Sequence, residues 1–269
     1  MGKIDIYYFT GTGNSLAVAR DIAEKTKGNL IPITSQLNKR IIKTEADIIG
    51  LVFPIYDFKP PEILINFIDK LKNVDSKYFF AVCTYGITPA KSLKYLDEIL
   101  SSYGGNLSGG FAVQMPHNGI GSGAINKSRH KKMYDDWNNK LEEICKYVKY
   151  NKKGTIETSI LFLNLFQFRF LKMIPYLIKF LFLLLLKGID SLEFTSSQQC
   201  NECGICEKVC PVNNINIESG KPVWSDHCEG CFACLHWCPK EAISIGGYKM
   251  NIKSYHHPDV KIIDIINND

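Results

Sequence analysis

The chain has 269 residues, of which 45 % are hydrophobic and 22 % charged, and its formal net charge is +5. This length favours two domains, and the composition excludes a disordered or collagen-like chain. Residues 1–193 carry 26 Lys and Arg against 18 Asp and Glu, whereas residues 194–269 carry 6 against 9. Opposite net charges favour docking of the two parts against each other. No Arg-rich helix or aromatic-basic motif accompanies the basic excess, so a nucleic-acid partner is not expected.

The first predicted element is a buried strand over residues 3–9, which are β-branched and aromatic. It runs directly into the loop Thr10-Gly11-Thr12-Gly13-Asn14-Ser15, and apolar residues at helical spacing then predict a helix over 16–25. A strand, a turn rich in glycine and hydroxyl groups, and a helix N-terminus together direct backbone N–H groups at an anion.

The kind of anion follows from what the loop lacks. A dinucleotide fingerprint requires a third glycine where Leu16 stands, and a nucleotide-triphosphate loop requires a Gly-Lys-Ser/Thr run that is absent here. The loop has no positive charge, but four of its side chains are able to form hydrogen bonds: Thr10, Thr12, Asn14 and Ser15. Such a loop suits a single terminal phosphate bound by neutral donors.

This loop resembles the first loop of the flavodoxins, which has the pattern Ser/Thr-x-Thr-Gly-Asn-Ser/Thr and wraps the phosphate of FMN. The matching residues are Thr10, Thr12, Gly13, Asn14 and Ser15, with Gly11 at the variable position. The resemblance implies FMN as the cofactor and these six residues as its phosphate-binding loop. The alternative is an ordinary turn between a strand and a helix.

The following segments continue the alternation of strands and helices. Strands are predicted over 29–33, 46–53, 78–84 and 110–115, and helices over 62–71, 89–100 and 128–150. Five strands alternating with helices predict an α/β fold with a doubly wound parallel sheet. In the flavodoxin-like strand order 2-1-3-4-5, the ligand lies at the carboxyl ends of the first and third strands.

Two further loops lie where the flavin ring is then expected. Pro54-Ile55-Tyr56 follows the third strand, and Thr84-Tyr85-Gly86 follows the fourth. Both carry a tyrosine suited to stacking on the ring, although each tyrosine fits an ordinary surface position as well. Many flavodoxins have glycine after the aromatic residue of the first of these loops. Asp57 stands there in this chain, so semiquinone stabilisation is not carried over.

The loop after the fifth strand, residues 115–123, contains three glycines and is expected to cover the flavin or to face the second domain. Asn118 is predicted to contact the flavin. His117 is interpreted as a loop histidine rather than an acid catalyst. Cys83 and Cys145 have no partners at ligand spacing and are interpreted as small buried hydrophobic residues.

Residues 156–193 form an apolar and basic segment without an acidic residue between Thr158 and Lys187. Its apolar runs are interrupted by cations and are far shorter than the roughly 18 residues needed to span a membrane. A helix over 169–187 would place its cations within an arc of about 80°, with a kink at Pro175. Two interpretations stay open: a connector packed between the domains, and a helix over 158–188 lying in a membrane surface.

Eight of the ten cysteines lie in two copies of one spacing, 28 positions apart. The copies read Cys200-x2-Cys203-x2-Cys206-x3-Cys210-Pro211 and Cys228-x2-Cys231-x2-Cys234-x3-Cys238-Pro239. An Ile-x-Ile pair follows each copy, at 215–217 and at 243–245. This matched ligand spacing is typical of iron–sulfur sites.

The repeat resembles the two-cluster bacterial ferredoxins over residues 194–247. The resemblance implies two 4Fe–4S clusters, each held by three closely spaced cysteines and by the fourth cysteine of the other copy. One cluster would be held by Cys200, Cys203, Cys206 and Cys238. The other would be held by Cys228, Cys231, Cys234 and Cys210.

Zinc and disulfides are the alternatives for these cysteines. Zinc sites use separated Cys-x2-Cys pairs, often with histidines, and do not explain the Cys-Pro endings. A disulfide framework requires an oxidising compartment, and no secretory signal is recognised in this sequence. A cytoplasmic protein is therefore expected, with peripheral contact to the inner face of the membrane if residues 158–188 lie in it.

The sequence thus predicts an FMN-binding domain (1–155), an apolar-basic helical connector (156–193), a two-cluster ferredoxin domain (194–247) and a tail (248–269) that adds a strand or a helix. This arrangement resembles the flavodoxin–ferredoxin fusion proteins of anaerobic microbes, often named EFR-family ferredoxins. The resemblance implies an electron carrier with redox partner proteins among ferredoxin-linked enzymes. The alternative is an FMN-dependent oxidoreductase that reduces a small molecule or a quinone, so whether the protein is an enzyme stays open.

Overall fold

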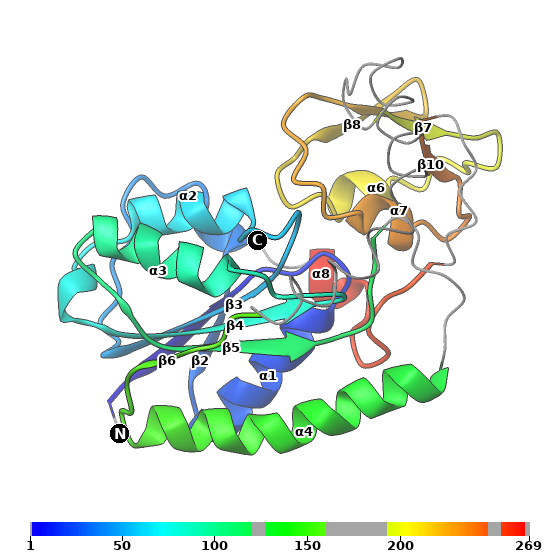
Figure 1. Cartoon of the computed structure of the whole chain (residues 1–269). Helices are drawn as coiled ribbons and strands as arrows, with labels where there is room; N and C mark the ends of the chain where they lie inside the picture. Colours follow the sequence, from blue (N-terminus) through cyan, green and yellow to red (C-terminus); the bar gives the residue numbers. More distant parts are fainter. Residues whose placement is uncertain (1, 120–126, 160–192, 247–253, 267–269) are drawn as a thin grey trace, which may run out of the picture.

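The structure is a computed structural model that describes residues 2–119, 127–159, 193–246 and 254–266. The N-terminal unit is a six-stranded parallel sheet in the order β2-β1-β3-β4-β5-β6 (Figure 1). The strands are β1 (Ile4–Tyr8), β2 (Asn29–Pro32), β3 (Ile48–Pro54), β4 (Tyr78–Tyr85), β5 (Leu107–Gln114) and β6 (Thr155–Ile156). The doubly wound parallel sheet and the order 2-1-3-4-5 are confirmed.

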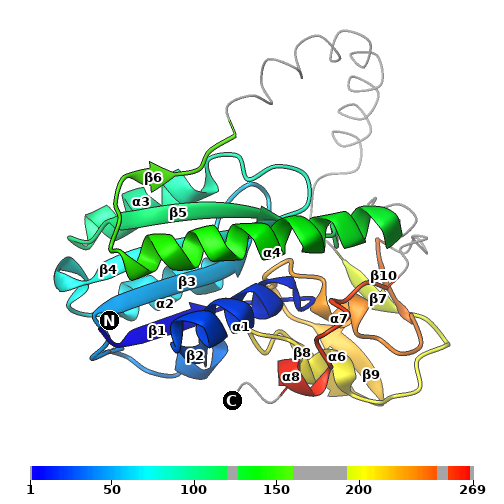
Figure 2. The same cartoon turned by 90° about the horizontal axis from the view of Figure 1, so that it is seen from below.

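Helices cover both faces of this sheet, which makes three layers (Figures 1 and 2). One face carries α1 (Asn14–Thr26) and α4 (Lys127–Lys149), and the other carries α2 (Glu62–Lys70) and α3 (Ser92–Ser102). Short 3₁₀ turns occupy Thr34–Gln36 and Val74–Ser76. The central strands β3 and β4 are buried between the layers, which explains their continuous apolar sequences.

Three details differ from the sequence-based expectation, the first being that β5 begins at Leu107 rather than at Gly110. The sheet has one more strand than the five expected, because Thr155 and Ile156 pair with β5 and the N–H of Glu157 donates to the carbonyl of Gly110 (2.9 Å). Helix α3 begins at Ser92 rather than at Pro89, because Ala90 has a left-handed backbone conformation (φ 47°) that a helix cannot continue through.

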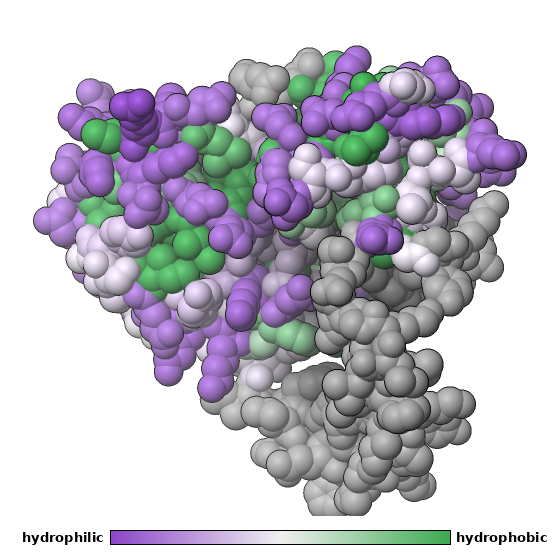
Figure 3. All heavy atoms as spheres, turned by 90° about the horizontal axis from the view of Figure 1, so that it is seen from above, coloured by the Kyte–Doolittle hydropathy of each residue, from purple (hydrophilic) through white to green (hydrophobic). Residues whose placement is uncertain are grey.

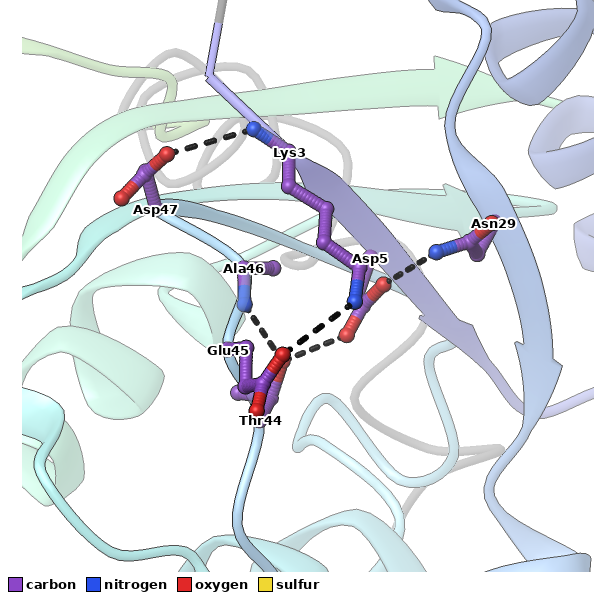
Figure 4. A network of polar contacts seen from close by, with 7 residues as sticks. All are labelled: Lys3, Asp5, Asn29, Thr44, Glu45, Ala46 and Asp47. Atoms are coloured by element: carbon purple, nitrogen blue, oxygen red, sulfur yellow. Dashed lines mark hydrogen bonds and ion pairs between the residues drawn. The ribbon is translucent and has the colours of Figure 1, made fainter.

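The amino-terminal edge of the sheet is held by a buried carboxylate (Figure 4). Asp5 of β1 is 6 % exposed and accepts hydrogen bonds from Asn29 Nδ2 (2.8 Å) and from Thr44 Oγ1. The Thr44 oxygen in turn accepts from the backbone N–H of Ala46 (3.0 Å). A buried carboxylate is tolerated when its oxygens have donors, so this network fixes β1 beside β2 and beside the segment that enters β3.

The C-terminal unit repeats its secondary structure at the 28-residue interval of the cysteines. Helix α6 (Ile205–Lys208) corresponds to α7 (Ala233–His236), and β8 (Ile215–Glu218) corresponds to β10 (Ile243–Ile245). Two antiparallel pairs complete the unit: β10 with β7 (Phe194–Ser196), and β8 with β9 (Lys221–Trp224). The unit lies at the carboxyl ends of the parallel strands (Figure 1).

The described part of the tail returns to the N-terminal unit and ends in α8 (Ile263–Ile266), so the expected helix is present. The Arg20 guanidinium of α1 pairs with the Asp264 carboxylate (2.9 Å) and lowers its pKa. Of the predicted connector, residues 160–192 lie outside the described residues. Among the described helices, none has the length and apolar character needed to cross a bilayer.

Hydrophilic residues cover most of the described surface seen from above, and apolar residues gather in one area on the left of this view (Figure 3). Among the large apolar side chains that the described residues expose are Phe58 and Ile87, each 61 % exposed. They follow the third and fourth strands of the sheet, at its carboxyl edge.

Two strand glycines provide a test of the packing. A Cβ at Gly50 of β3 would lie 2.5 Å from Phe80 Cζ, whereas a Cβ at Gly110 of β5 would meet no atom closer than 3.5 Å. Because the Phe80 ring is fully buried and cannot yield freely, we expect Gly50→Ala to lower the free energy of unfolding by about 1–3 kcal/mol. Gly110→Ala is the matched control and should leave it nearly unchanged. Urea unfolding of both variants without oxygen measures the difference, and equal stabilities would contradict this account.

Candidate cofactor sites

A cavity of about 480 Å³ opens at the carboxyl edge of the sheet. It is hereafter the flavin cavity, and its size is within the usual range for ligand pockets, roughly 300–1,000 Å³. Twelve of the thirteen residues predicted to bind the flavin line it: Thr10, Gly11, Thr12, Asn14, Ser15, Pro54, Ile55, Tyr56, Thr84, Tyr85, Gly86 and Asn118. The exception is Gly13, where a Cβ would meet Val260 and His257 of the tail.

The phosphate-type loop is closed by its own hydrogen bonds. Gly13 has φ 96°, a left-handed conformation that favours glycine, and its N–H donates to Thr10 Oγ1 (3.0 Å). Helix α1 begins at the next residue and has no acidic side chain in its first turn. Ser15 Oγ lies 2.9 Å from Thr84 Oγ1, which joins this loop to the end of β4. The cavity therefore receives the positive end of the α1 dipole, which no carboxylate in the first turn of that helix offsets.

The loop after β5 forms a second wall of the flavin cavity. Asn14 Nδ2 donates to the carbonyl of Pro116 (3.0 Å), and Asn118 Nδ2 donates to Thr12 Oγ1 (3.1 Å). His117 also lines the cavity and packs against Gly86, where a Cβ would lie 2.4 Å from its ring. Burial lowers the pKa of His117, which keeps its ring neutral at neutral pH.

Tyr56 begins a tight turn in which Asp57 and Phe58 both have left-handed backbones (φ 46° and 64°). Asp57 therefore adopts a left-handed conformation, which glycine adopts more easily than any other residue. The Tyr56 hydroxyl is buried without a hydrogen-bond partner and lies 2.9 Å from the place of a Cβ on Gly11. Burial raises its pKa well above the usual value. Tyr85 also lines the cavity and is half-buried.

Three residues of the C-terminal unit complete the flavin cavity, and the sequence did not indicate them: Glu229, Gly230 and Phe232. All come from the second cysteine copy. Glu229 Oε1 accepts from the backbone N–H of Ile63 (3.3 Å) in the first turn of α2, so the carboxylate also caps that helix. Burial raises the pKa of Glu229. One signal was available in the sequence: the first copy has Gly204 where the second has Phe232.

The eight cysteines fall into two groups that each line one small cavity of the C-terminal unit. The first cysteine site contains Cys200, Cys203, Cys206 and Cys238. The second cysteine site contains Cys210, Cys228, Cys231 and Cys234. Each group thus combines three cysteines of one copy with the last cysteine of the other.

Backbone amides face the cysteine sulfurs in a repeated pattern. The N–H of Asn214 donates to Cys210 Sγ (3.2 Å), and 28 positions later the N–H of Ala242 donates to Cys238 Sγ (3.3 Å). Burial raises the pKa of the Cys206 thiol to about 11 and that of Cys234 to about 12. These thiols are therefore neutral at neutral pH unless a metal displaces their protons.

Two of the buried polar groups without partners point to missing cofactor atoms. They are the Tyr56 hydroxyl in the flavin cavity and the indole N–H of Trp224, which lines the second cysteine site. Buried donors normally have acceptors, so both cavities fit occupants that carry them. In the described ranges, no three His, Cys, Asp or Glu side chains group closely enough for one metal ion.

The second cysteine site lies directly against the flavin cavity. Glu229 and Phe232 line both. A Cβ on Gly11 would lie 2.8 Å from the carbonyl oxygen of Cys231. The indole N–H of Trp237 donates to the carbonyl of Gly11 (3.0 Å), a buried bond between the two units.

His236 provides another contact between the units. Its Nδ1 accepts from the backbone N–H of Tyr255 (3.2 Å), and its Nε2 lies 2.6 Å from the carbonyl oxygen of Asn118. Because a backbone N–H can only donate and a carbonyl can only accept, the ring carries its proton on Nε2 and is neutral. Burial lowers its pKa in agreement with this state.

Comparison with known proteins finds a matching family for each of the two units. The flavodoxin domain family matches residues 5–129, and the 4Fe-4S dicluster domain family matches residues 194–239. No curated protein matches the chain.

Among solved structures the likenesses are distant and cover about half of the chain. Two-electron reduced flavodoxin from Megasphaera elsdenii is 20 % identical over 43 % of this chain and 90 % of its own, with a TM-score of 0.34. FMN-dependent NADH-azoreductase from Bacillus anthracis, in complex with FMN, is 13 % identical over 54 % and 99 %, with a TM-score of 0.39. Trp repressor binding protein from Bacillus subtilis is 18 % identical over 52 % and 96 %, with a TM-score of 0.36.

The two family matches coincide with the two units of the structure and together cover the phosphate-type loop and all eight repeat cysteines. The chain is a fusion of an N-terminal flavodoxin domain with a C-terminal 4Fe-4S dicluster domain, the composition of a flavodoxin–ferredoxin fusion protein.

Proposed function

We propose that this protein carries electrons between FMN in the flavin cavity and two 4Fe-4S clusters in the two cysteine sites. The single observation that carries the proposal is the shared wall, because Glu229 and Phe232 line both the flavin cavity and the second cysteine site. Redox centres exchange electrons readily only when they lie close together. Two cofactor cavities separated by the side chains of one loop meet that requirement.

The flavin would be held by neutral donors at its phosphate and by tyrosines at its ring. Thr10, Thr12, Asn14 and Ser15 line the phosphate end, at the N-terminus of α1. Tyr56 and Tyr85 lie on the two loops that follow β3 and β4. Among the described residues that line the cavity there is no lysine or arginine, which favours a single phosphate over a di- or triphosphate.

Each cluster would be held by the four cysteines that line its site. Bound FMN supplies one- or two-electron chemistry and the clusters supply one-electron chemistry, so the protein would connect one- and two-electron redox partners. The side chains and backbone of the protein would separate the cofactors and influence their reduction potentials. Phe232 and Glu229 fill the space between the cavities, and the N–H groups of Asn214 and Ala242 donate to cysteine sulfurs, which affects reduction potentials.

The two cysteine sites would have different roles. The second site adjoins the flavin cavity, whereas none of the described residues that line the first site lines the flavin cavity. We therefore assign the first site as the outlet toward redox partner proteins. The acidic excess of residues 194–269 would favour partners with a basic docking face.

A second candidate function is reduction of a small molecule or a quinone at the flavin. The observation that favours it is the lining of the flavin cavity, which includes Ile87 with 61 % of its surface exposed. An exposed apolar side chain there suits a flat, poorly charged acceptor.

Cofactor analysis is the first test of the proposal. Protein purified without oxygen should contain about eight iron and eight sulfide per chain, because each 4Fe-4S site takes four of each. It should also contain one FMN. Iron, sulfide and flavin determination on the same sample measures this. Zinc in place of iron, or protein without flavin, would refute the proposal.

Serine substitutions test the crosswise ligand sets. Cys210→Ser and Cys231→Ser should both disturb the second site and leave the cluster of the first site intact. Cys203→Ser and Cys238→Ser should both disturb the first site and leave the cluster of the second site intact. Electron paramagnetic resonance of the reduced variants should therefore give two pairs of matching spectra, with Cys145→Ser as an unaffected control. If Cys210→Ser matched Cys203→Ser instead, each copy would hold its own cluster.

Steady-state assays distinguish the two candidate functions. Reduced protein should transfer electrons rapidly to basic redox proteins and only slowly to small acceptors such as quinones and azo dyes. Ionic strength provides the control, because transfer to a protein partner should slow as salt screens the docking charges. Fast, salt-independent turnover of a small acceptor would favour the oxidoreductase.

A further inference from the structure

The described tail residues 254–257 pass between the phosphate-type loop and α4. The backbone N–H of His257 donates to the carbonyl of Thr12 (2.9 Å). The rings of Tyr134 and His257 lie edge to face with centroids 5.0 Å apart, and so do those of His130 and Tyr255 at 5.5 Å. The tail therefore packs against α4 on one side and against the phosphate-type loop on the other.

Tyr255 makes the most direct contact with the loop. It is 7 % exposed, and its hydroxyl donates to Asn14 Oδ1 (2.6 Å). The Tyr134 hydroxyl lies 3.1 Å away from it. A tyrosine hydroxyl has one proton, and that of Tyr255 is already given to an amide oxygen, which can only accept. Tyr134 is therefore the donor to Tyr255, and the two hydroxyls form a directed chain that ends at Asn14.

This chain fixes the orientation of the Asn14 amide. Its oxygen accepts from Tyr255, and its nitrogen donates one hydrogen to the carbonyl of Pro116 (3.0 Å). The second hydrogen on Nδ2 is not used by either bond. Asn14 lines the flavin cavity, so this hydrogen is available to an anion there. A rotated amide would turn its oxygen toward the anion instead and would repel it.

The same tyrosine is tied to the cluster-binding unit. The backbone N–H of Tyr255 donates to His236 Nδ1, and His236 Nε2 donates to the carbonyl of Asn118. Asn118 Nδ2 in turn donates to Thr12 Oγ1. Residues of the second cysteine copy and of the tail thus reach the cavity at two points: His236 holds the backbone of Asn118, and Tyr255 contacts the Asn14 side chain.

We infer that Tyr255 is a positioning residue for the flavin phosphate: it orients the Asn14 amide so that an N–H, not the oxygen, faces the phosphate. The inference rests on the proposed FMN site. It adds a physical reason why that site would bind a phosphorylated flavin in preference to riboflavin. Riboflavin lacks the phosphate, so it gains nothing from this orientation. Tyr255 thereby contributes to discrimination between FMN and riboflavin without touching either.

The test compares flavin affinities of deflavinated protein that retains its clusters. Tyr255→Phe keeps the ring and removes one hydrogen bond, so the dissociation constant of FMN should rise about tenfold, as expected for about 1.4 kcal/mol. The dissociation constant of riboflavin should not change. Tyr103→Phe is the matched control, because its exposed hydroxyl donates to Asp69 far from the cavity, and it should leave both constants unchanged. Flavin fluorescence quenching measures all of them.

A double-mutant cycle shows whether the effect passes through Asn14. In an Asn14→Ala background, Tyr255→Phe should cause no further loss of FMN affinity. If Tyr255→Phe does not fold, Tyr134→Phe removes the previous donor of the chain and should cause a smaller loss confined to FMN. Equal losses of FMN and riboflavin, or no loss, would overturn the inference. Wild-type protein that binds no flavin would instead refute the proposed function.

Discussion

The close approach between the phosphate-type loop and the second cysteine copy governs the rest of this structure. The carbonyl of Gly11 accepts the buried Trp237 indole N–H, and the missing side chain at Gly11 leaves room for the carbonyl of Cys231. A buried acceptor that lost its donor would cost about 1–3 kcal/mol. The two units are therefore held in one arrangement, and the shared wall of the cofactor cavities is a consequence of it.

Much of the fold could be predicted because its signals are local. The run Thr10–Ser15 joins a strand to a helix, and its neighbours in sequence are its neighbours in space. The cysteine spacing likewise predicts which residues belong together, since the two copies repeat α6 as α7 and β8 as β10. The start of α3 was misplaced because Ala90, a residue with good helix propensity, has a left-handed backbone that only its surroundings impose.

The parts that could not be predicted depend on docking between the units. Glu229 and Phe232 line the flavin cavity, but nothing in their own segment specifies which cysteine copy faces the flavin. The same holds for Tyr255, whose partner Asn14 is 241 positions away. The two copies have become unequal at this interface. Gly204 and Phe232 cap equivalent helices with left-handed backbones, which glycine adopts freely and phenylalanine at a cost of about 1 kcal/mol. The side chain that bears this cost separates the two cofactor cavities.

The path of the tail has a consequence for how the protein is made. Tyr255 is synthesised 241 positions after its partner Asn14. At roughly 5–20 residues per second, synthesis of the sheet is complete at Ile156 on the order of 5–20 s before Tyr255 is made. During that interval the phosphate-type loop lacks the contacts of Tyr255 and His257. Tight flavin acquisition would then follow translation of the cysteine copies, and a truncated chain would hold its flavin weakly.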